Sequence, residues 1–219
     1  MSILSILIVA QLVSCHSEEK RKFAPEEEAI YSLGQMQARR LAYLDLSPNE
    51  QEIFILGYRG AAFNSSATAT TISEGEIQRF IEQRIRNVAE KEKKKGAAYM
   101  RAFVAKGGKQ SPSGLGYEII GLGNSKRAKV GDTIEVHYHG TFIDGTIFDS
   151  SLDRGKTIEI PLRSVIVGWQ EGLQLIGEGG EIRLVVPSDL GYGEQGSQPQ
   201  IRGGQTLVFY IKLFKIPGG

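Results

Sequence analysis

In the first half of the chain, apolar residues recur every three to four positions, which is the period of an amphipathic helix. One such stretch covers residues 26 to 44. A second begins at Ser47-Pro48-Asn49-Glu50, which combines a capping serine, a proline at the first helical position and a glutamate three residues after the cap. A similar capping box at Ser73-Glu74-Gly75-Glu76 starts a third helix, which would be about 45 to 50 Å long if it continues to residue 105. The pattern therefore predicts three helices, of which the last is long.

The apolar stripe of the third helix lies only near its start, over residues 77 to 88, and a charged run follows at residues 90 to 95. We therefore expect the middle of this helix to be a solvated stalk, in which Gly96 either introduces a bend or has no effect. The two shorter helices are too small to form a stable core as a monomer, which favours pairing with a second copy of the chain. The alternative is a helical appendage that stays monomeric.

The second half of the chain has a different texture, because most of its 27 glycines follow Gln110. The turn-rich residues 106 to 116 indicate a domain boundary. One short helical stretch, residues 169 to 176, places Trp169, Leu173 and Ile176 on one face that would cover a sheet. Segments of β type occupy residues 119–120, 133–138, 158–160, 182–186 and 207–213. This half is predicted to be an α+β domain with an antiparallel sheet.

The N-terminus carries an apolar run, residues 3 to 13, that is too short to cross a bilayer as a permanent helix. It ends in Leu12-Val13-Ser14-Cys15, which resembles a bacterial lipobox. We therefore expect residues 1 to 14 to be a lipoprotein signal peptide and residues 15 to 25 to be a flexible tether. A lipid on Cys15 would anchor the protein to the bacterial cell envelope, at the periplasmic face or in the outer membrane. The alternatives are a soluble signal peptide or a cytosolic N-terminus that is merely apolar.

Composition narrows the range of partners. The 26 Lys and Arg residues nearly balance the 25 Asp and Glu residues, so we predict no nucleic-acid partner. A hydrophobic content of 41% is enough for one or two packed cores. Cys15 is the only cysteine, which excludes a disulfide within the chain. His137 and His139 share one face of a predicted strand and could suit a metal, but we interpret them as structural and predict neither a metal nor a cofactor.

Four fragments of the second half carry the main functional signal. They are Val-His-Tyr-His-Gly-Thr at 136–141, Asp-Gly-Thr-Ile-Phe-Asp-Ser-Ser at 144–151, Val-Ile-Val-Gly-Trp at 165–169 and Leu-Gly-Tyr-Gly at 190–193. In this order they resemble the FKBP-type peptidyl-prolyl isomerases. The resemblance implies an enzyme that rotates the peptide bond before proline in an apolar pocket, with no nucleophile, metal or cofactor. It also implies that residues 106 to 219 fold as a half-barrel sheet wrapped around one short helix.

The helical half is similar in architecture to the N-terminal part of the macrophage infectivity potentiator and FkpA type of isomerase. In these dimeric bacterial envelope proteins, intertwined helices and a long connecting helix hold two catalytic domains apart. The resemblance implies that residues 26 to 105 are a helical dimerisation domain with a stalk helix. It also implies that the partners are a second copy of the chain and unfolded or partly folded polypeptides that contain proline, with macrolide inhibitors as further possible ligands.

The same resemblance assigns the site residues. It places Trp169 at the floor of the pocket and uses the Tyr192 hydroxyl and the Ile166 amide to bind carbonyl groups of the ligand. Taken singly, each apolar residue could be an ordinary core residue and Asp149 could be a turn or cap residue, but together and in order they favour a pocket. The catalytic residues implied are Tyr138, Phe148, Asp149 and Tyr192. The substrate-binding residues implied are Val165, Ile166, Trp169, Ile158, Ile201 and Phe209.

Two departures from the family pattern bear on activity. Ile158 stands where a phenylalanine is usual, and Arg202-Gly203 replaces prolines that commonly follow Ile201. We therefore expect the loop after Tyr192 to be more mobile, which leaves open the preferred residue before proline and the affinity for macrolides. We predict that isomerase activity is retained. The alternative is a holdase-type chaperone or surface binding protein with a weak or vestigial isomerase pocket.

Overall fold

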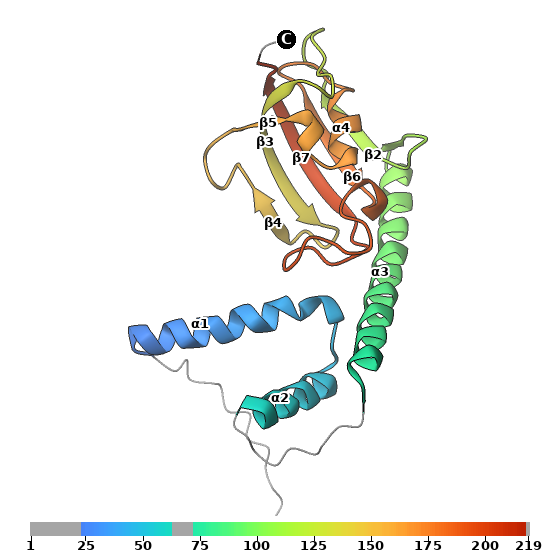
Figure 1. Cartoon of the computed structure of the whole chain (residues 1–219). Coiled ribbons are helices and arrows are strands. Elements are labelled where there is room, and N and C mark those ends of the chain that lie inside the picture. Colours follow the sequence, from blue (N-terminus) through green and yellow to red (C-terminus); the bar gives the residue numbers. More distant parts are fainter. Residues whose placement is uncertain (1–22, 63–71, 218–219) are drawn as a thin grey trace, which may run out of the picture. The chain divides into compact units, whose positions relative to one another are not determined.

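The computed structural model describes residues 23–62 and 72–217 (Figure 1). The expected signal peptide, Cys15 and most of the expected tether lie outside the described residues. The chain divides into two compact units, residues 1–38 and 39–219. The first unit contains most of helix α1 (Pro25–Arg40), and the second contains the remaining elements. Among the described helices, none is both long enough and apolar enough to span a bilayer.

Helices α2 (Pro48–Ala62) and α3 (Glu74–Ala105) begin where the two capping boxes predict. The Ser73 amide donates to Glu76 Oε2 at 2.9 Å, and the Glu76 amide donates back to Ser73 Oγ at 3.3 Å. Two of the amides that a helix cannot satisfy internally are thereby paired. The same reciprocal bonds join Ser47 and Glu50 at 2.7 and 3.4 Å.

The first helix is shorter than predicted. It ends at Arg40, and the chain then makes one turn of 3-10 helix, η1 (Ala42–Leu44). Asp45 follows with a φ of 49°, which is in the left-handed region and ends the right-handed helical path. Asp45 also holds several cationic side chains, which are described below.

The second unit contains one sheet whose strand pairings are all antiparallel. The strand order is β1-β2-β6-β7-β3-β4, and β5 pairs with β3 beside this path. The α+β class and the antiparallel sheet are thus confirmed, although periodicity alone did not indicate β1 and β4, which are short. The bounds are β1 (Lys109–Gln110), β2 (Gly116–Gly121), β3 (Thr133–Phe142), β4 (Ile147–Ser150), β5 (Ile158–Pro161), β6 (Glu181–Val186) and β7 (Leu207–Lys215).

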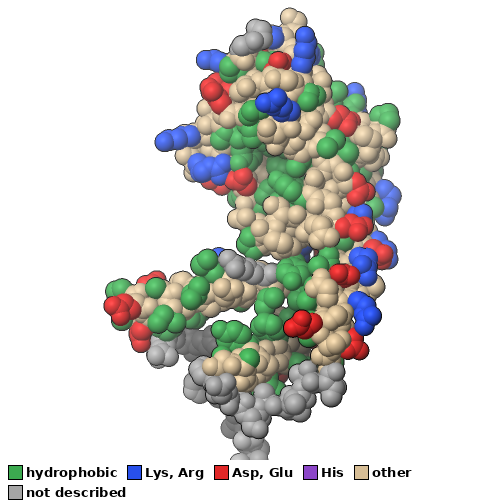
Figure 2. Space-filling view, in the orientation of Figure 1, with side chains coloured by type: hydrophobic (Ala, Val, Ile, Leu, Met, Phe, Trp, Pro, Cys, Tyr) green, Lys and Arg blue, Asp and Glu red, His purple; other side chains and the backbone are tan. Residues whose placement is uncertain are grey.

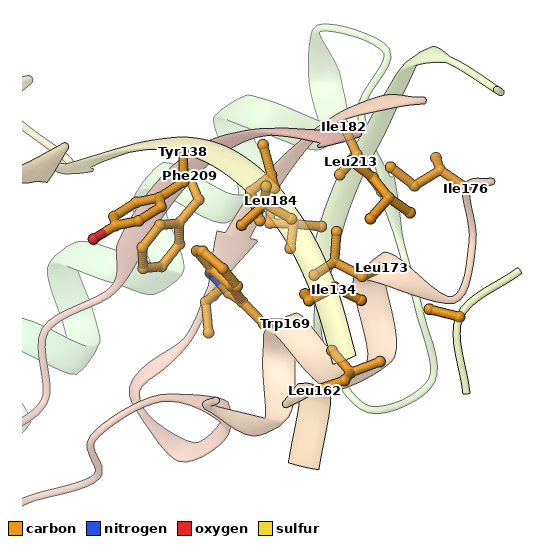
Figure 3. Close-up of a cluster of buried hydrophobic side chains, with 14 of the residues drawn as sticks. Ile134, Tyr138, Leu162, Trp169, Leu173, Ile176, Ile182, Leu184, Phe209 and Leu213 are labelled. Carbon is orange, nitrogen blue, oxygen red and sulfur yellow. The ribbon is translucent and has the colours of Figure 1, made fainter. Parts of the chain in front are cut away.

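A short helix, α4 (Val167–Leu173), covers one face of the sheet and closes the core (Figure 3). It begins two residues before the predicted start and ends sooner, but Trp169, Leu173 and Ile176 are all buried as expected. Gly172 allows α4 to lie close to β6, because a Cβ atom there would come within 2.5 Å of Leu184 Cδ2. Short 3-10 turns, η2 (Leu162–Ser164) and η3 (Ser188–Leu190), flank the helix and β6.

The prediction that the middle of α3 is a solvated stalk is wrong. Val88, Ala89, Gly96 and Met100 are buried, because the later part of α3 packs against the domain that carries the sheet. Gly96 has a packing role, since a Cβ atom there would lie 2.0 Å from Thr206 Oγ1. Contact between helix and domain also explains why the boundary between compact units falls near residue 38 and not near residue 106.

Candidate active site

Four aromatic side chains from separate parts of the chain meet on the inner side of the sheet, and we refer to them as the aromatic cluster. Tyr138 comes from β3, Phe148 from β4, Trp169 from α4 and Phe209 from β7. The ring centroid of Trp169 lies 5.3 Å from that of Tyr138 and 5.2 Å from that of Phe209, with edge-to-face geometry in both pairs. Figure 3 shows these three rings pointing toward one another. The sheet and α4 therefore bring together side chains that lie far apart in sequence.

A glycine makes room for one side of the cluster. Phe148 packs edge-on against Phe209, with centroids 5.5 Å apart. A Cβ atom on Gly140 would lie 2.8 Å from Phe148 and 3.0 Å from Phe209. Any larger residue at this position of β3 would push the two rings apart. Sequence reasoning included Gly140 in a family fragment but gave it no role.

A polar group borders the aromatic cluster. The Tyr138 hydroxyl donates to Asp149 Oδ2 in a short hydrogen bond, and Arg154 donates to Asp149 Oδ1 at 2.5 Å. Arg154 also donates to the Tyr138 hydroxyl oxygen at 2.8 Å, and its guanidinium lies 5.7 Å from the centre of the Tyr138 ring. The three residues thus form a closed polar network at the edge of an apolar surface. Sequence reasoning missed Arg154, which belongs to none of the four family fragments. It reaches the site because the turn at residues 151–155 folds back toward Tyr138.

The network fixes the charge state of its members. Burial raises the pKa of Asp149, but the hydrogen bonds from Tyr138 and Arg154 together lower it further, so the pKa lies below the ordinary aspartate value. Burial and the Asp149 carboxylate both raise the pKa of the Tyr138 hydroxyl. At neutral pH, therefore, Asp149 is ionised and Tyr138 is a neutral donor. This arrangement provides fixed dipoles and has no free base available for proton transfer.

The remaining predicted site residues lie around the cluster. Ile158 pairs with Val136 across β5 and β3, and Ile166 is the residue that caps α4. Trp169 Nε1 is buried and has no hydrogen-bond partner among the described residues. The predicted site residues that belong to the hydrophobic core or pack against it are Tyr138, Phe148, Ile158, Val165, Ile166, Trp169, Ile201 and Phe209.

Tyr192 and Ile201 are on one loop, residues 192 to 204. Tyr192 is 40% exposed, and its pKa is raised by burial and by the negative charge of Asp149. Ile201 is buried and exchanges two backbone hydrogen bonds of 2.8 Å with Ser197. Further bonds join Gly196 to Tyr192 at 3.1 Å and Gly204 to Gly193 at 2.9 Å. Backbone hydrogen bonds within the loop therefore connect its two ends, although Arg202-Gly203 replaces the prolines.

His137 and His139 each pair with a serine hydroxyl group. His137 Nδ1 lies 3.0 Å from Ser151 Oγ, and His139 Nδ1 lies 3.0 Å from Ser150 Oγ. Within residues 23–62 and 72–217, no group of three or more His, Cys, Asp or Glu side chains is placed to hold a metal ion.

Two cavities of about 140 and 300 Å³ lie away from the aromatic cluster and are lined by α3 and its neighbours.

Comparison with known proteins now identifies the fold and its family. Residues 124–214 match the family "FKBP-type peptidyl-prolyl cis-trans isomerase". The chain is 30% identical over 259 residues to the FKBP-type peptidyl-prolyl cis-trans isomerase FkpA of Aeromonas hydrophila, and the match covers 99% of this chain and 93% of that protein. The chain belongs to the FKBP-type isomerases. It is also 35% identical to FkpA of Escherichia coli K12, over 87% of this chain and 76% of that protein.

The structural comparison agrees with this family. The crystal structure of FkpA from Escherichia coli matches with a TM-score of 0.62 at 30% identity, covering 90% of this chain and 98% of that chain. The resemblance to the FkpA type of FKBP isomerase is thereby confirmed, as is the order of a helical N-terminal part before the FKBP domain. The chain also matches a probable FKBP-type isomerase FkpA of Neisseria meningitidis at 46% identity. That match covers 58% of this chain and 47%, or about half, of the relative.

Proposed function

We propose that this protein is a peptidyl-prolyl cis-trans isomerase that acts on proline-containing unfolded or partly folded polypeptides. The observation that carries the proposal is the aromatic cluster with the polar network of Tyr138, Asp149 and Arg154 at its edge. Family membership supports the same activity, and it does not favour the alternative of a holdase-type binding protein with a vestigial pocket.

The reaction requires an apolar surface and fixed dipoles. Rotation about the bond before proline meets a barrier of about 18 to 20 kcal/mol, because amide resonance resists twisting. The planar amide is polar and well hydrated, whereas the twisted amide has lost conjugation and carries less charge on its oxygen. A site that removes water and presents rings to the prolyl residue therefore stabilises the twisted state relative to the planar one. No bond is made or broken, so no nucleophile is required.

We assign the roles on this basis. Trp169 forms the floor, and Phe148 and Phe209, which pack against each other, form walls beside the proline ring. The buried Trp169 N–H lacks a partner among the described residues, and a buried unpaired donor costs roughly 1 to 3 kcal/mol, so a ligand acceptor would offset this penalty. The Tyr192 hydroxyl and the Ile166 amide bind carbonyl groups of the substrate. The side chains that surround the prolyl residue are Tyr138, Asp149, Ile158, Val165 and Ile201.

The activity is tested with the full chain in a protease-coupled assay on an Ala-Leu-Pro-Phe peptide. Acceleration of cis-to-trans isomerisation in proportion to protein concentration is expected. Trp169 is the only tryptophan, so its fluorescence reports binding of the same peptide at the proposed site, and a matched peptide with alanine in place of proline serves as the control. Prevention of aggregation without any acceleration would instead support the holdase alternative. Displacement of the peptide by a macrolide tests the proposed inhibitor binding in the same format.

We also propose that the N-terminal helices, residues 26 to 105, form a homodimer interface. Large apolar side chains are exposed on each of these helices: on α1 Ile30 is 71% exposed, on α2 Leu56 is 71% exposed, and near the start of α3 Phe80 is 55% exposed. Figure 2 shows hydrophobic side chains on the surface of both α1 and α2. A monomeric protein rarely leaves large contiguous apolar patches uncovered, and a second copy of the chain would bury them.

The dimer is tested by the solution mass of a chain that starts at residue 23. A mass of twice the monomer is expected at micromolar concentration, and Leu56→Glu should shift the protein toward the monomer. Exposed Leu122 lies in the FKBP domain, and Leu122→Glu provides a matched control that should leave the mass unchanged. A monomeric wild-type protein across the concentration range would contradict the proposal.

We place the protein in the bacterial cell envelope, anchored by a lipid on Cys15. Support comes from the apolar run that ends in Leu12-Val13-Ser14-Cys15 and from similarity to FkpA proteins. Fractionation of cells that express the full sequence tests the anchor. The wild-type protein should enter the membrane fraction, and Cys15→Ser should release it. Release of neither variant, or of both, would contradict lipidation at this residue.

A further inference from the structure

The loop of residues 192 to 204 carries Tyr192, whose hydroxyl is proposed to bind a substrate carbonyl group, and the proposed substrate-binding residue Ile201. The other side of the loop faces η1 and α3. Among these contacts is a set of ion pairs that crosses from the helical segment to the loop. Arg202 donates to Asp45 Oδ1 at 3.0 Å, although the two residues are 157 positions apart in sequence. Arg202 also stands at a position where the resemblance to the family leads one to expect proline.

Contacts with α3 hold Asp45 in the position where it pairs with Arg202. Its carboxylate also accepts a hydrogen bond from Lys91 of α3 at 2.9 Å, through the other oxygen. Its carbonyl oxygen accepts from Arg84 of α3 at 3.2 Å, which holds the left-handed backbone at this residue in place. The hydrogen bond from Lys91 and the charge of Arg202 lower the pKa of Asp45 despite partial burial, so it is ionised at neutral pH. Asp45 therefore joins α3 to the loop through a carboxylate that is held from both sides.

A second tie runs from α3 to the start of the same loop. Lys93 pairs with Asp189 at 3.0 Å and with Glu194 at 3.3 Å. At the loop's end, a Cβ atom on Gly204 would lie 2.1 Å from the Ala89 carbonyl oxygen, so the backbones of the loop and α3 are in close contact there. Helix α3 thus contacts the loop at its beginning and at its end.

Between these ties the loop is not packed tightly. A cavity of about 140 Å³ separates it from the helices and is lined by Tyr43, Ile85, Val88, Gln195, Gln198 and Gly203. Apolar packing therefore does not fix the middle of the loop against α3. The backbone bonds within the loop fix its internal shape, whereas the ion pairs and the contact at Gly204 fix its position against α3, which gives them more influence over Tyr192 and Ile201 than isolated surface pairs would have.

We propose that Asp45 and Arg202 are positioning residues for substrate binding, which hold the 192 to 204 loop so that Tyr192 and Ile201 face the prolyl substrate. The inference rests on the proposed isomerase function and extends it, because it makes η1 and α3 part of the substrate site. Since the loop binds substrate and does not twist the amide, its loosening should raise KM for the peptide more than it lowers kcat.

The test measures kcat and KM for the Ala-Leu-Pro-Phe peptide with the full chain and four variants. Both Arg202→Gln and Asp45→Asn should raise KM about three- to fivefold, the range expected when a partly exposed ion pair is lost, with kcat changed less than twofold. Asparagine tolerates the left-handed backbone of residue 45, so this variant removes charge without adding strain. The double variant should raise KM no more than either single variant, because both remove one interaction. Arg202→Lys should restore part of the wild-type KM.

Lys95→Gln is the matched control, because Lys95 lies on the same helix and pairs with Glu92 at 2.7 Å, not with Asp45 or the loop. This variant should leave KM within twofold of the wild-type value. The wild-type KM should also rise with added salt toward that of Arg202→Gln, whereas the KM of Arg202→Gln itself should change little with salt. A purely structural role would lower the midpoint of thermal unfolding without this salt-dependent change in KM.

Two outcomes separate this inference from the function on which it rests. An active wild-type protein whose KM is the same in Arg202→Gln would overturn the positioning role and leave the isomerase intact. An inactive wild-type protein would overturn the isomerase. In that case the positioning role is tested by comparing the peptide Kd, measured from Trp169 fluorescence, between the wild type and Arg202→Gln. Equal Kd values would reject the positioning role.

Discussion

The contact between α3 and the FKBP domain predicts that Gly96 cannot be replaced, even by alanine. Alanine in the middle of a helix normally stabilises it by up to about 1 kcal/mol relative to glycine. At residue 96, however, the new Cβ atom would lie 2.0 Å from Thr206 Oγ1 and 2.8 Å from Thr206 Cβ. Rotation of the Thr206 side chain relieves only the first clash, so the helix or the backbone at Thr206 must shift, and overpacking of this kind costs roughly 1 to 3 kcal/mol. The net expectation for Gly96→Ala is a loss of about 1 to 2 kcal/mol.

Thermal and urea unfolding of the full chain test this value, since about 1 kcal/mol lowers the midpoint by roughly 2 to 4 °C in a protein of this size. Gly75 is in the same helix and has no atom within 4 Å of its would-be Cβ, so Gly75→Ala is the matched control and should be neutral or slightly stabilising. Thr206→Ala in the Gly96→Ala background should recover part of the loss, because it removes the closest atom. If Gly96→Ala proved as stable as Gly75→Ala, α3 would not be docked on the domain as described.

Three further predictions concern the polar network and the helix caps. Arg154→Gln removes two hydrogen bonds from the edge of the site and should lower kcat/KM about two- to fivefold in the peptide assay, and unchanged kinetics would exclude Arg154 from the site. Because the pKa of Asp149 is lowered in the folded state, its contribution to stability is present above the unfolded pKa of about 3.9 and is lost as the pH falls through the folded value. Isomerase activity should therefore be flat from about pH 8 to pH 5 in a pH profile, and a fall centred near neutrality would mean that another group controls the site. Ser73→Ala removes the capping box of α3 and should cost about 1 kcal/mol in urea unfolding, with no effect expected on KM, and a stability equal to wild type would show that the cap is not used.

Local signals predicted the helix starts and the class of the fold. A capping box involves residues three positions apart, so Ser73 and Glu76 contain the whole interaction within the sequence. Alternation along β3 likewise reports directly which side chains face the core. The end of the first helix was misplaced, because Asp45 adopts its left-handed backbone with the help of Arg84, a residue 39 positions away.

Contacts between distant segments were not predictable in this way. The charged run on α3 is typical of a solvated helix face, and only the fold shows that Lys93 pairs with Asp189 and Glu194 on a loop about a hundred residues later. The sequence showed Arg202 only as the replacement of a proline and gave no sign that its partner is Asp45. Prediction failed here because long-range pairs leave no periodic or motif signal in a single sequence.

The site residues came from family fragments and not from periodicity. The structure places the rings of Tyr138, Phe148, Trp169 and Phe209 in contact, and it adds Arg154 and Gly140, which the fragments did not single out. Buried aromatic residues are common in any core, so no property of these residues taken singly separates a pocket wall from packing.

The central claim is that the aromatic cluster is the surface on which the prolyl bond turns. The most direct test is the kcat/KM of full-length Phe148→Ala in the peptide assay, compared with Phe214→Ala, which removes a ring that packs edge-to-face against His137 outside the cluster. Phe148→Ala should lower kcat/KM at least tenfold while Phe214→Ala leaves it within about twofold, since loss of a ring that contacts the twisted prolyl group removes roughly 1.4 kcal/mol or more of transition-state stabilisation. Equal kcat/KM values for the two variants would contradict the claim.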